Sequence, residues 1–179
     1  PLHSAGASGH IEVVRALVKW RAVLEARNAW SWTPLHLASS DGASGAATKL
    51  LECRADVHAR AKWDLTALHL AATSGHAKVV SVLCVGGADV EARESNGYRA
   101  LHRAAKYGHG DVAELLCTRR AHLEAQGLDE ATALSCAALE GHAELVELLC
   151  RKRSDMESRN VEGATPLHVA ARRNCEKAL

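Results

Sequence analysis

Aromatic residues are scarce in this chain of 179 residues: they make up 3%, and phenylalanine is absent. The hydrophobic fraction of 47% must therefore come mainly from aliphatic side chains, which predicts thin core layers rather than a centre built on large rings. An excess of one charge is missing too, because 22 basic and 21 acidic residues give a net charge of +1. This balance does not favour a polyanion as the partner. No apolar run approaches the ~18 residues of a membrane span, so we expect no membrane partner.

Signatures of catalysis and of bound metals are also missing. The stretch Gly42–Gly45 resembles a phosphate loop, but no Gly-Lys-Ser/Thr follows at the required spacing. Ser135 and Cys136 lie together without an evident acid–base partner. The six cysteines include no Cys-x-x-Cys pair and fit a reducing compartment, the cytoplasm or nucleus. The sequence therefore predicts a protein that is not an enzyme and that needs no cofactor or metal.

One short motif returns along the whole chain with a fixed spacing. Its leucines lie at positions 2, 35, 68, 101, 134 and 167, and every successive difference is 33. Such self-similarity is typical of a repeat array, in which one supersecondary unit stacks on copies of itself. The copies are 1–5 (truncated), 33–38, 66–71, 99–104, 132–137 and 165–170.

Each unit reads as helix, turn, helix and extended loop. Thr33 is a good helix N-cap and Pro34 suits the first helical position. Gly75 and His76 mark the turn, and apolar residues at helical spacing follow it. The spacing predicts a partial unit at 1–27, complete units at 28–60, 61–93, 94–126 and 127–159, and a partial unit at 160–179. Because the chain begins inside a motif and stops partway through a unit, we expect a fragment of a longer protein, with uncapped ends that favour end-to-end self-association.

The period and the motif Thr-Pro-Leu-His-x-Ala, seen at 33–38 and 165–170, resemble the ankyrin repeat. This resemblance implies an all-α solenoid of stacked helix-turn-helix units with short β-hairpin loops. It also implies a concave surface, formed by hairpin tips and first helices, that binds other proteins. Two departures stand out: Arg99 replaces the motif Thr and should remove a cap, and Ser135 replaces the motif His.

The eleven histidines fall into repeated positions, which favours capping and turn hydrogen bonds over metal binding. Equivalent residues in neighbouring repeats should lie roughly 8–10 Å apart. Zinc ligands must converge within about 2.0–2.3 Å of one point, so a ladder of histidines does not form a zinc site. Cys84, Cys117 and Cys150 are likewise 33 apart, too far for disulfides.

The few aromatic residues are concentrated on hairpin tips. Trp30, Trp32, Trp63 and Tyr98 lie there in three consecutive repeats, and Trp and Tyr dominate interface hot spots. We therefore predict that these four form one ridge that anchors a partner. The alternative is that the tryptophans pack on each other to stiffen the hairpins. The predicted site also includes six neighbours on the tips or the concave side: Lys62, Leu65, Arg99, Arg103, Lys106 and Tyr107.

The leading hypothesis for function is a non-catalytic scaffold that binds another protein through hairpin tips and concave face. One alternative is the substrate-recruiting arm of a larger enzyme. Another is a module that binds nucleic acid or a nucleotide, by base stacking beside Lys62, Arg99 and Arg103. The near-neutral charge argues against that third class. We also predict that the second unit is the least stable, because Gly45 interrupts its second helix at a cost of about 1 kcal/mol relative to Ala.

Overall fold

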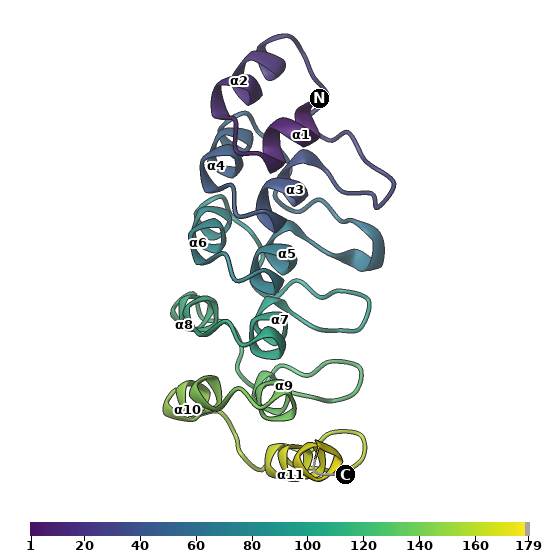
Figure 1. Cartoon of the computed structure of the whole chain (residues 1–179), viewed down its shortest axis with the longest axis vertical. Coiled ribbons are helices and arrows are strands. Elements are labelled where there is room, and N and C mark those ends of the chain that lie inside the picture. Colours follow the sequence, from purple (N-terminus) through teal and green to yellow (C-terminus); the bar gives the residue numbers. More distant parts are fainter. Residues whose placement is uncertain (178–179) are drawn as a thin grey trace.

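The structure, a computed structural model, describes the backbone of residues 1–177 and the side chains of residues 1–172. Within this part the chain forms eleven α-helices in two parallel columns, and one short 3-10 helix, η1 (Lys62–Asp64), in a projecting loop (Figure 1). The first helices of the units form the inner column: α1 (Leu2–Ala7), α3 (Pro34–Ser40), α5 (Ala67–Thr73), α7 (Ala100–Tyr107), α9 (Ala133–Glu140) and α11 (Pro166–Lys177). The second helices form the outer column: α2 (Ile11–Lys19), α4 (Ser44–Glu52), α6 (Ala77–Val85), α8 (Gly110–Thr118) and α10 (Ala143–Arg151).

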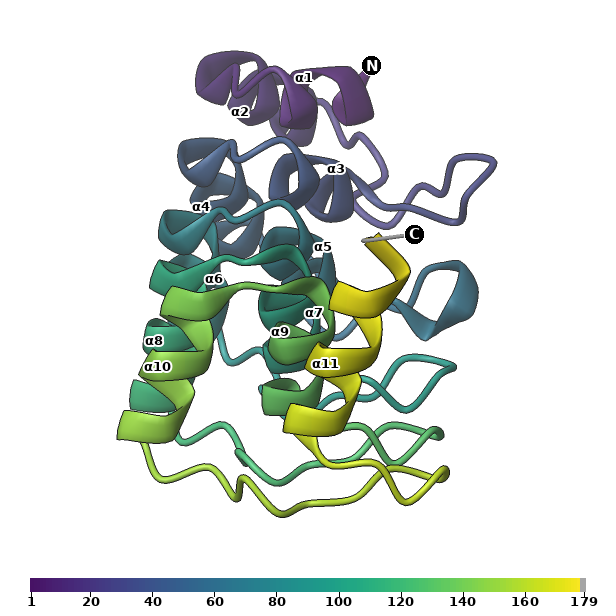
Figure 2. The same cartoon turned by 60° about the horizontal axis from the view of Figure 1, so that its bottom comes forward.

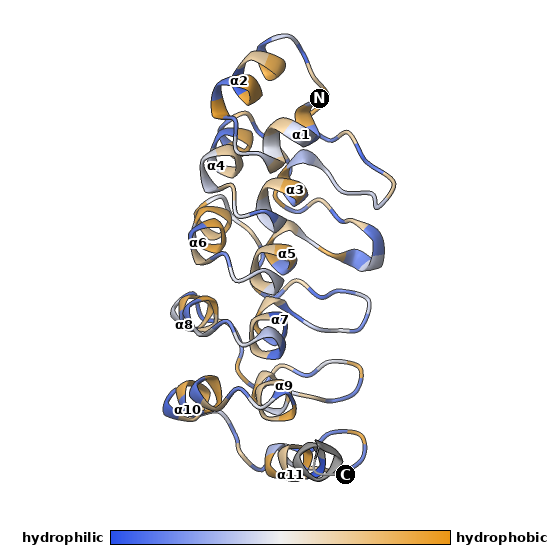
Figure 3. Ribbon diagram, viewed as in Figure 1, coloured by the Kyte–Doolittle hydropathy of each residue, from blue (hydrophilic) through white to orange (hydrophobic). Residues whose placement is uncertain are grey.

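The core of this array is aliphatic, as the composition predicts. Leucines at the repeat spacing fill the inner column, and a second set fills the outer column, each at most 2% exposed. The apolar faces of the helices meet between the columns (Figure 3). Stacking therefore buries one continuous layer of small side chains, and each unit packs on its neighbours. The two sets are Leu35, Leu68, Leu101 and Leu134, and Leu50, Leu83, Leu116 and Leu149.

Four motif histidines, His3, His36, His69 and His102, each join their unit to the next. The Thr66 side chain accepts from the His69 backbone N–H, while His69 Nδ1 accepts from Thr66 N at 3.2 Å. His69 Nε2 therefore carries the proton and donates to Tyr98 O at 3.2 Å. Burial lowers the pKa of His69 to about 4, which keeps the ring neutral as these bonds require. The predicted capping role of the motif histidines is confirmed here.

The turn between the two helices of a unit depends on glycine and histidine. Gly75 has φ +77°, a left-handed conformation that glycine adopts readily. A Cβ at Gly75 would lie 2.5 Å from His109 Nδ1, so the imidazole ring fits there only because residue 75 has no side chain. His109 Nε2 in turn bonds to Thr73 O at 2.9 Å, and His76 Nε2 to Ser40 O at 3.0 Å. The predicted turn bonds are confirmed, and each one crosses to the preceding unit.

The loops that follow the outer helices project to one side of the array (Figure 2). They have the outline of hairpins, but residues 1–177 contain no strand. Backbone bonds close each loop, for example Glu94 N to Tyr98 O at 3.0 Å and Gly97 N to Glu94 O at 2.8 Å. Further bonds join neighbouring tips: Lys62 N donates to Trp30 O at 3.2 Å, and Ser95 N to Trp63 O at 3.0 Å. The predicted all-α solenoid is confirmed, with loops too short to form strands.

Two sequence departures have clear local consequences. Arg99 makes no side-chain cap, as predicted, although His102 Nδ1 still accepts from Arg99 N at 3.2 Å. Gly45 lies inside an intact α4, where a Cβ would come within 2.6 Å of Ile11 Cδ1. Gly45 therefore admits a side chain from α2, a packing role that the sequence did not indicate. Among the residues described, no helix is both long and apolar enough to cross a bilayer.

Candidate functional site

Trp30 and Trp63 form an exposed aromatic pair at the tips of the loops 28–32 and 61–65. Their ring centroids are 6.2 Å apart and their planes are tilted by 38°. Trp30 is 55% exposed and Trp63 is 61% exposed. Lys62 Nζ lies 5.6 Å from the Trp30 ring centroid, within range of a cation–π interaction. We call Trp30 and Trp63 the tryptophan pair.

The backbone beneath the tryptophan pair adopts an uncommon conformation. Trp63 and Asp64 lie in η1 (Lys62–Asp64) with φ of 58° and 55°, and Ser31 has φ 58°. Left-handed backbone is uncommon for residues other than glycine, and for a bulky one it costs roughly 1–3 kcal/mol. Such strain persists where surrounding structure fixes the chain, here through the bond from Lys62 N to Trp30 O.

Two arginines brace the same loops from below. Arg27 Nη1 donates to Ser31 O at 3.4 Å and also to Arg60 O in the next loop. Arg60 Nη1 donates to Asp64 O at 2.9 Å and also to Arg93 O. Both side chains remain exposed. Positive charge is therefore fixed close to the tryptophan pair by contacts with main-chain carbonyls.

Trp32 and Leu65 lie beneath the tips rather than on them. Leu65 is buried with Ala61 and Leu70, and the half-buried Trp32 packs against this small cluster. Trp32 and Leu65 are each the fifth residue of a loop, whereas Trp30 and Trp63 are each the third. The register of the repeat thus separates the outward side chains from the inward ones.

Tyr98, also a fifth loop residue, is turned toward the following repeat. Its ring stacks on His102 with centroids 5.1 Å apart and planes 6° apart. Its hydroxyl donates to Asp129 Oδ2 at 2.6 Å. Burial, then the bond to Asp129, raises the pKa of the Tyr98 phenol. A Cβ on Gly127 would lie 2.2 Å from Tyr98 Cε1, so the ring rests directly on that glycine. Tyr98 therefore joins two repeats.

The basic residues near Tyr98 are engaged in ion pairs. Arg99 Nε lies 2.7 Å from Glu91 Oε2. Arg103 Nε lies 3.1 Å from Glu94 Oε2, a second nitrogen of Arg103 contacts the same oxygen, and the Glu94 side chain is only 1% exposed. Glu94 takes a loop position that holds Asn, Ala or Gly in the other repeats, and the repeat pattern did not predict it as a site residue. A charged residue at that position, nine residues before an arginine, was the available signal.

The structure thus places the predicted residues in three groups. Trp30, Lys62 and Trp63 are exposed together, and the fifth loop residues with Arg99 and Arg103 are packed or paired. Lys106 and Tyr107 are exposed on the last turn of α7. A cavity of about 290 Å³ links the first two groups; its walls include Trp63, Leu65, Glu94, Ser95, Asn96 and Arg103.

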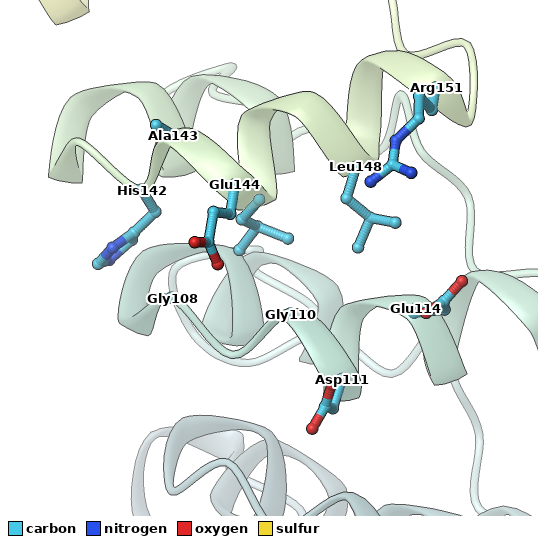
Figure 4. A pocket seen from close by; sticks show the side chains of 10 residues that line it. Gly108, Gly110, Asp111, Glu114, His142, Ala143, Glu144, Leu148 and Arg151 are labelled. Atoms are coloured by element: carbon cyan, nitrogen blue, oxygen red, sulfur yellow. The ribbon is translucent and has the colours of Figure 1, made fainter.

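Besides a hollow of about 450 Å³ between α4 and α6, two larger ones lie elsewhere. One of about 530 Å³ separates α8 from α10, where Glu144 and Leu148 point from α10 toward α8 (Figure 4). Its space is left partly by Gly110, at which a Cβ would meet no atom within 4 Å. The other, about 540 Å³, is apolar and lies beside α11, where Leu167 is 77% exposed. Neither contains the predicted binding residues.

Groups suited to catalysis or metal binding are not assembled in the described part. No group of three or more His, Cys, Asp or Glu side chains among those residues has the geometry to hold a metal ion. Burial raises the pKa of Cys136 to about 12, so its thiol is a poor nucleophile at neutral pH. Five cysteines are free thiols, and Cys175 lies outside the described side chains; the five are Cys53, Cys84, Cys117, Cys136 and Cys150.

Comparison with known families places this architecture. A family model described as ankyrin repeats in three copies matches residues 1–61, 35–127 and 119–179. A search of curated proteins found no matching sequence. Ankyrin repeats are generally protein–protein interaction modules and are typically not enzymes. The matches cover the chain from end to end and agree with the stacked helix pairs, so the chain belongs to the ankyrin-repeat family.

Proposed function

We propose that this chain is a non-catalytic module that binds another protein through its loop tips and concave face. The observation that carries the proposal is the tryptophan pair, more than half exposed on adjacent tips. Large aromatic side chains are the residues most enriched at interface hot spots. Two of them in mutual contact at the most projecting part of the fold provide an anchor for a partner.

The loops hold this anchor in a fixed position. Backbone bonds from Lys62 N to Trp30 O and from Ser95 N to Trp63 O join three consecutive tips. A surface that is already ordered loses little conformational entropy on binding, so more of the contact energy appears as affinity. The 290 Å³ cavity beside Trp63 extends the same surface toward Arg103. We place the exposed Lys106 and Tyr107 at its concave margin.

We further propose that the chain resides in a reducing compartment and associates with copies of itself. Free thiols at five cysteines fit the cytoplasm or nucleus. The apolar groove beside Leu167 supports contact between copies of this chain. Sedimentation equilibrium should then show association that rises with concentration and weakens in Leu167→Glu. A monomer at all concentrations would remove self-association from the proposal and leave the tip surface untouched.

The binding proposal is tested by substitution at the tips after a partner has been selected with the whole chain. Trp30→Ala and Trp63→Ala should each weaken binding by about 2 kcal/mol or more, which is roughly thirtyfold. Trp20→Ala is the matched control, because Trp20 is 83% exposed but lies at the end of α2. Equal affinities for all three variants and the wild type would refute a binding role for the tryptophan pair.

A further inference from the structure

Positive charge predominates in the loops that carry the tryptophan pair. Loops 27–32 and 60–65 carry Arg27, Arg60 and Lys62 against one exposed carboxylate, Asp64. Arg93 occupies the next equivalent position and is exposed as well. None of the ion pairs found among residues 1–172 includes any of these four cations. The net charge of +1 for the whole chain therefore conceals a basic patch.

The loops at the other end of the array carry the opposite charge. Loops 126–131 and 159–164 hold Asp129, Glu130 and Glu162 against a single arginine, Arg159. The third loop residue, which is Trp30 or Trp63 in the basic half, is Asp129 or Glu162 there. Charge and aromatic character thus change together along the row of tips. Only the half that carries the tryptophan pair is basic.

We propose that this surface binds an acidic, extended segment of the partner protein that also carries an aromatic residue or leucine. We call the four cations Arg27, Arg60, Lys62 and Arg93 the basic patch. The inference rests on the function proposed above and adds the chemistry of the partner. The tryptophan pair takes the apolar side chain, and the basic patch takes carboxylates around it. A guanidinium has five N–H donors, so Arg27 and Arg60 keep donors for a carboxylate while Nη1 bonds to the loops.

The repeat spacing sets the pattern expected in the segment. Equivalent residues of neighbouring repeats lie about 10 Å apart, because that is the packing distance of their helices. An extended chain advances about 3.3 Å per residue. Carboxylates that meet successive arginines should therefore be about three residues apart, as in Asp/Glu-x-x-Asp/Glu-x-x-Asp/Glu.

Single-stranded nucleic acid is the competing ligand for aromatic and basic side chains. Such binding commonly relies on aromatic rings that accept stacked bases. Here the indoles lie 6.2 Å apart, within the contact range of aromatic pairs, so they leave no slot for a base between them. This geometry favours a protein segment over a row of nucleobases.

The test is a selection of displayed random dodecapeptides on the whole chain, followed by affinity measurements on the enriched peptide. We expect enriched sequences with at least three acidic residues at the stated spacing and one aromatic residue or leucine. The double variant Lys62→Gln, Arg93→Gln should bind that peptide about tenfold more weakly. Raising the salt concentration from about 50 to about 200 mM should lower the affinity of the wild-type chain as well. Arg151→Gln, an exposed arginine of α10, should change affinity less than twofold. Urea unfolding of each variant verifies that it is folded.

Three outcomes would overturn the inference, and they separate it from the proposed function. Neutral or basic peptides whose binding needs Trp30 and Trp63 would overturn the acidic segment and leave the binding module standing. Peptides whose binding ignores both tryptophans would overturn both proposals. A fifteen-residue oligothymidylate that binds more tightly than the enriched peptide and displaces it would assign the surface to nucleic acid.

Discussion

The third and fifth residues of the projecting loops behave in opposite ways. Trp30 and Trp63, at the third position, point into solvent, whereas Tyr98, at the fifth, points into the array. The difference follows from what the next repeat offers. Tyr98 finds Gly127 to rest on and Asp129 to bond with, one repeat later. An aromatic side chain can therefore serve as an anchor for a partner at the third loop position, or stabilise the contact between repeats at the fifth.

The largest loss of stability should follow when the ion pair between Glu94 and Arg103 is removed. Arg103→Ala leaves Glu94, whose side chain is 1% exposed, without its cation. Loss of one member of a buried ion pair costs about 3–5 kcal/mol. Urea unfolding should show a loss of that order for Arg103→Ala and under about 0.5 kcal/mol for exposed Lys62→Ala. The double variant Glu94→Ala, Arg103→Ala should recover much of the loss; no recovery would contradict the pairing account.

Acid should lower the free energy of unfolding, because the buried motif histidines must stay neutral in the folded chain. Burial lowers the folded-state pKa of both His69 and His102 to about 4, against about 6.5 when unfolded. The unfolded chain then binds more protons between pH 6.5 and 4, so stability is full above pH 6.5 and falls toward pH 4. Each histidine should therefore lower the free energy of unfolding by about 2 kcal/mol between pH 7 and 5, because each pH unit in this range contributes up to about 1.36 kcal/mol. Unfolding at several pH values measures this; a flat profile would show that neither ring must stay neutral.

A smaller loss should follow when Tyr98 loses only its hydroxyl. Tyr98→Phe removes the bond to Asp129 but keeps the ring on Gly127 and His102. One hydrogen bond contributes about 1 kcal/mol net. Chemical denaturation should therefore show a decrease of that size, and Asp129→Asn in the same background should add little. An unchanged midpoint would mean that the hydroxyl contributes nothing to the link between repeats.

The smallest effects concern two helix glycines. A Cβ on Gly110 would meet no atom within 4 Å, whereas one on Gly45 would crowd Ile11 Cδ1 at 2.6 Å. Gly110→Ala should therefore stabilise the chain by about 0.5 kcal/mol, as removal of backbone freedom usually does. Gly45→Ala should gain less, because Ile11 must move. Thermal unfolding of both variants is the test, and a larger gain at Gly45 would contradict the close packing of α2 on α4.

Much of the fold was predictable from the sequence, because the spacing of 33 fixes which residues are equivalent. The position of Gly75, the bonds of His69 and the missing cap at Arg99 all follow from register. Whether each aromatic side chain is exposed or buried could not be predicted from its presence on a loop tip. The residue between the third and fifth loop positions has positive φ, as at Ser31 and Asp64, which reverses the strand-like alternation of side chains. Contacts with the next repeat then decide burial.

Parallel urea unfolding of Trp63→Ala and Tyr98→Ala tests most directly whether the third and fifth loop positions have separate roles. If the tryptophan pair is reserved for a partner, Trp63→Ala should cost no more than about 1 kcal/mol, the value of one aromatic contact. Tyr98→Ala should cost at least about 2 kcal/mol, because it removes a half-buried ring and a hydrogen bond together. Equal losses at the two positions would contradict this account and make the tryptophans braces of the hairpin loops.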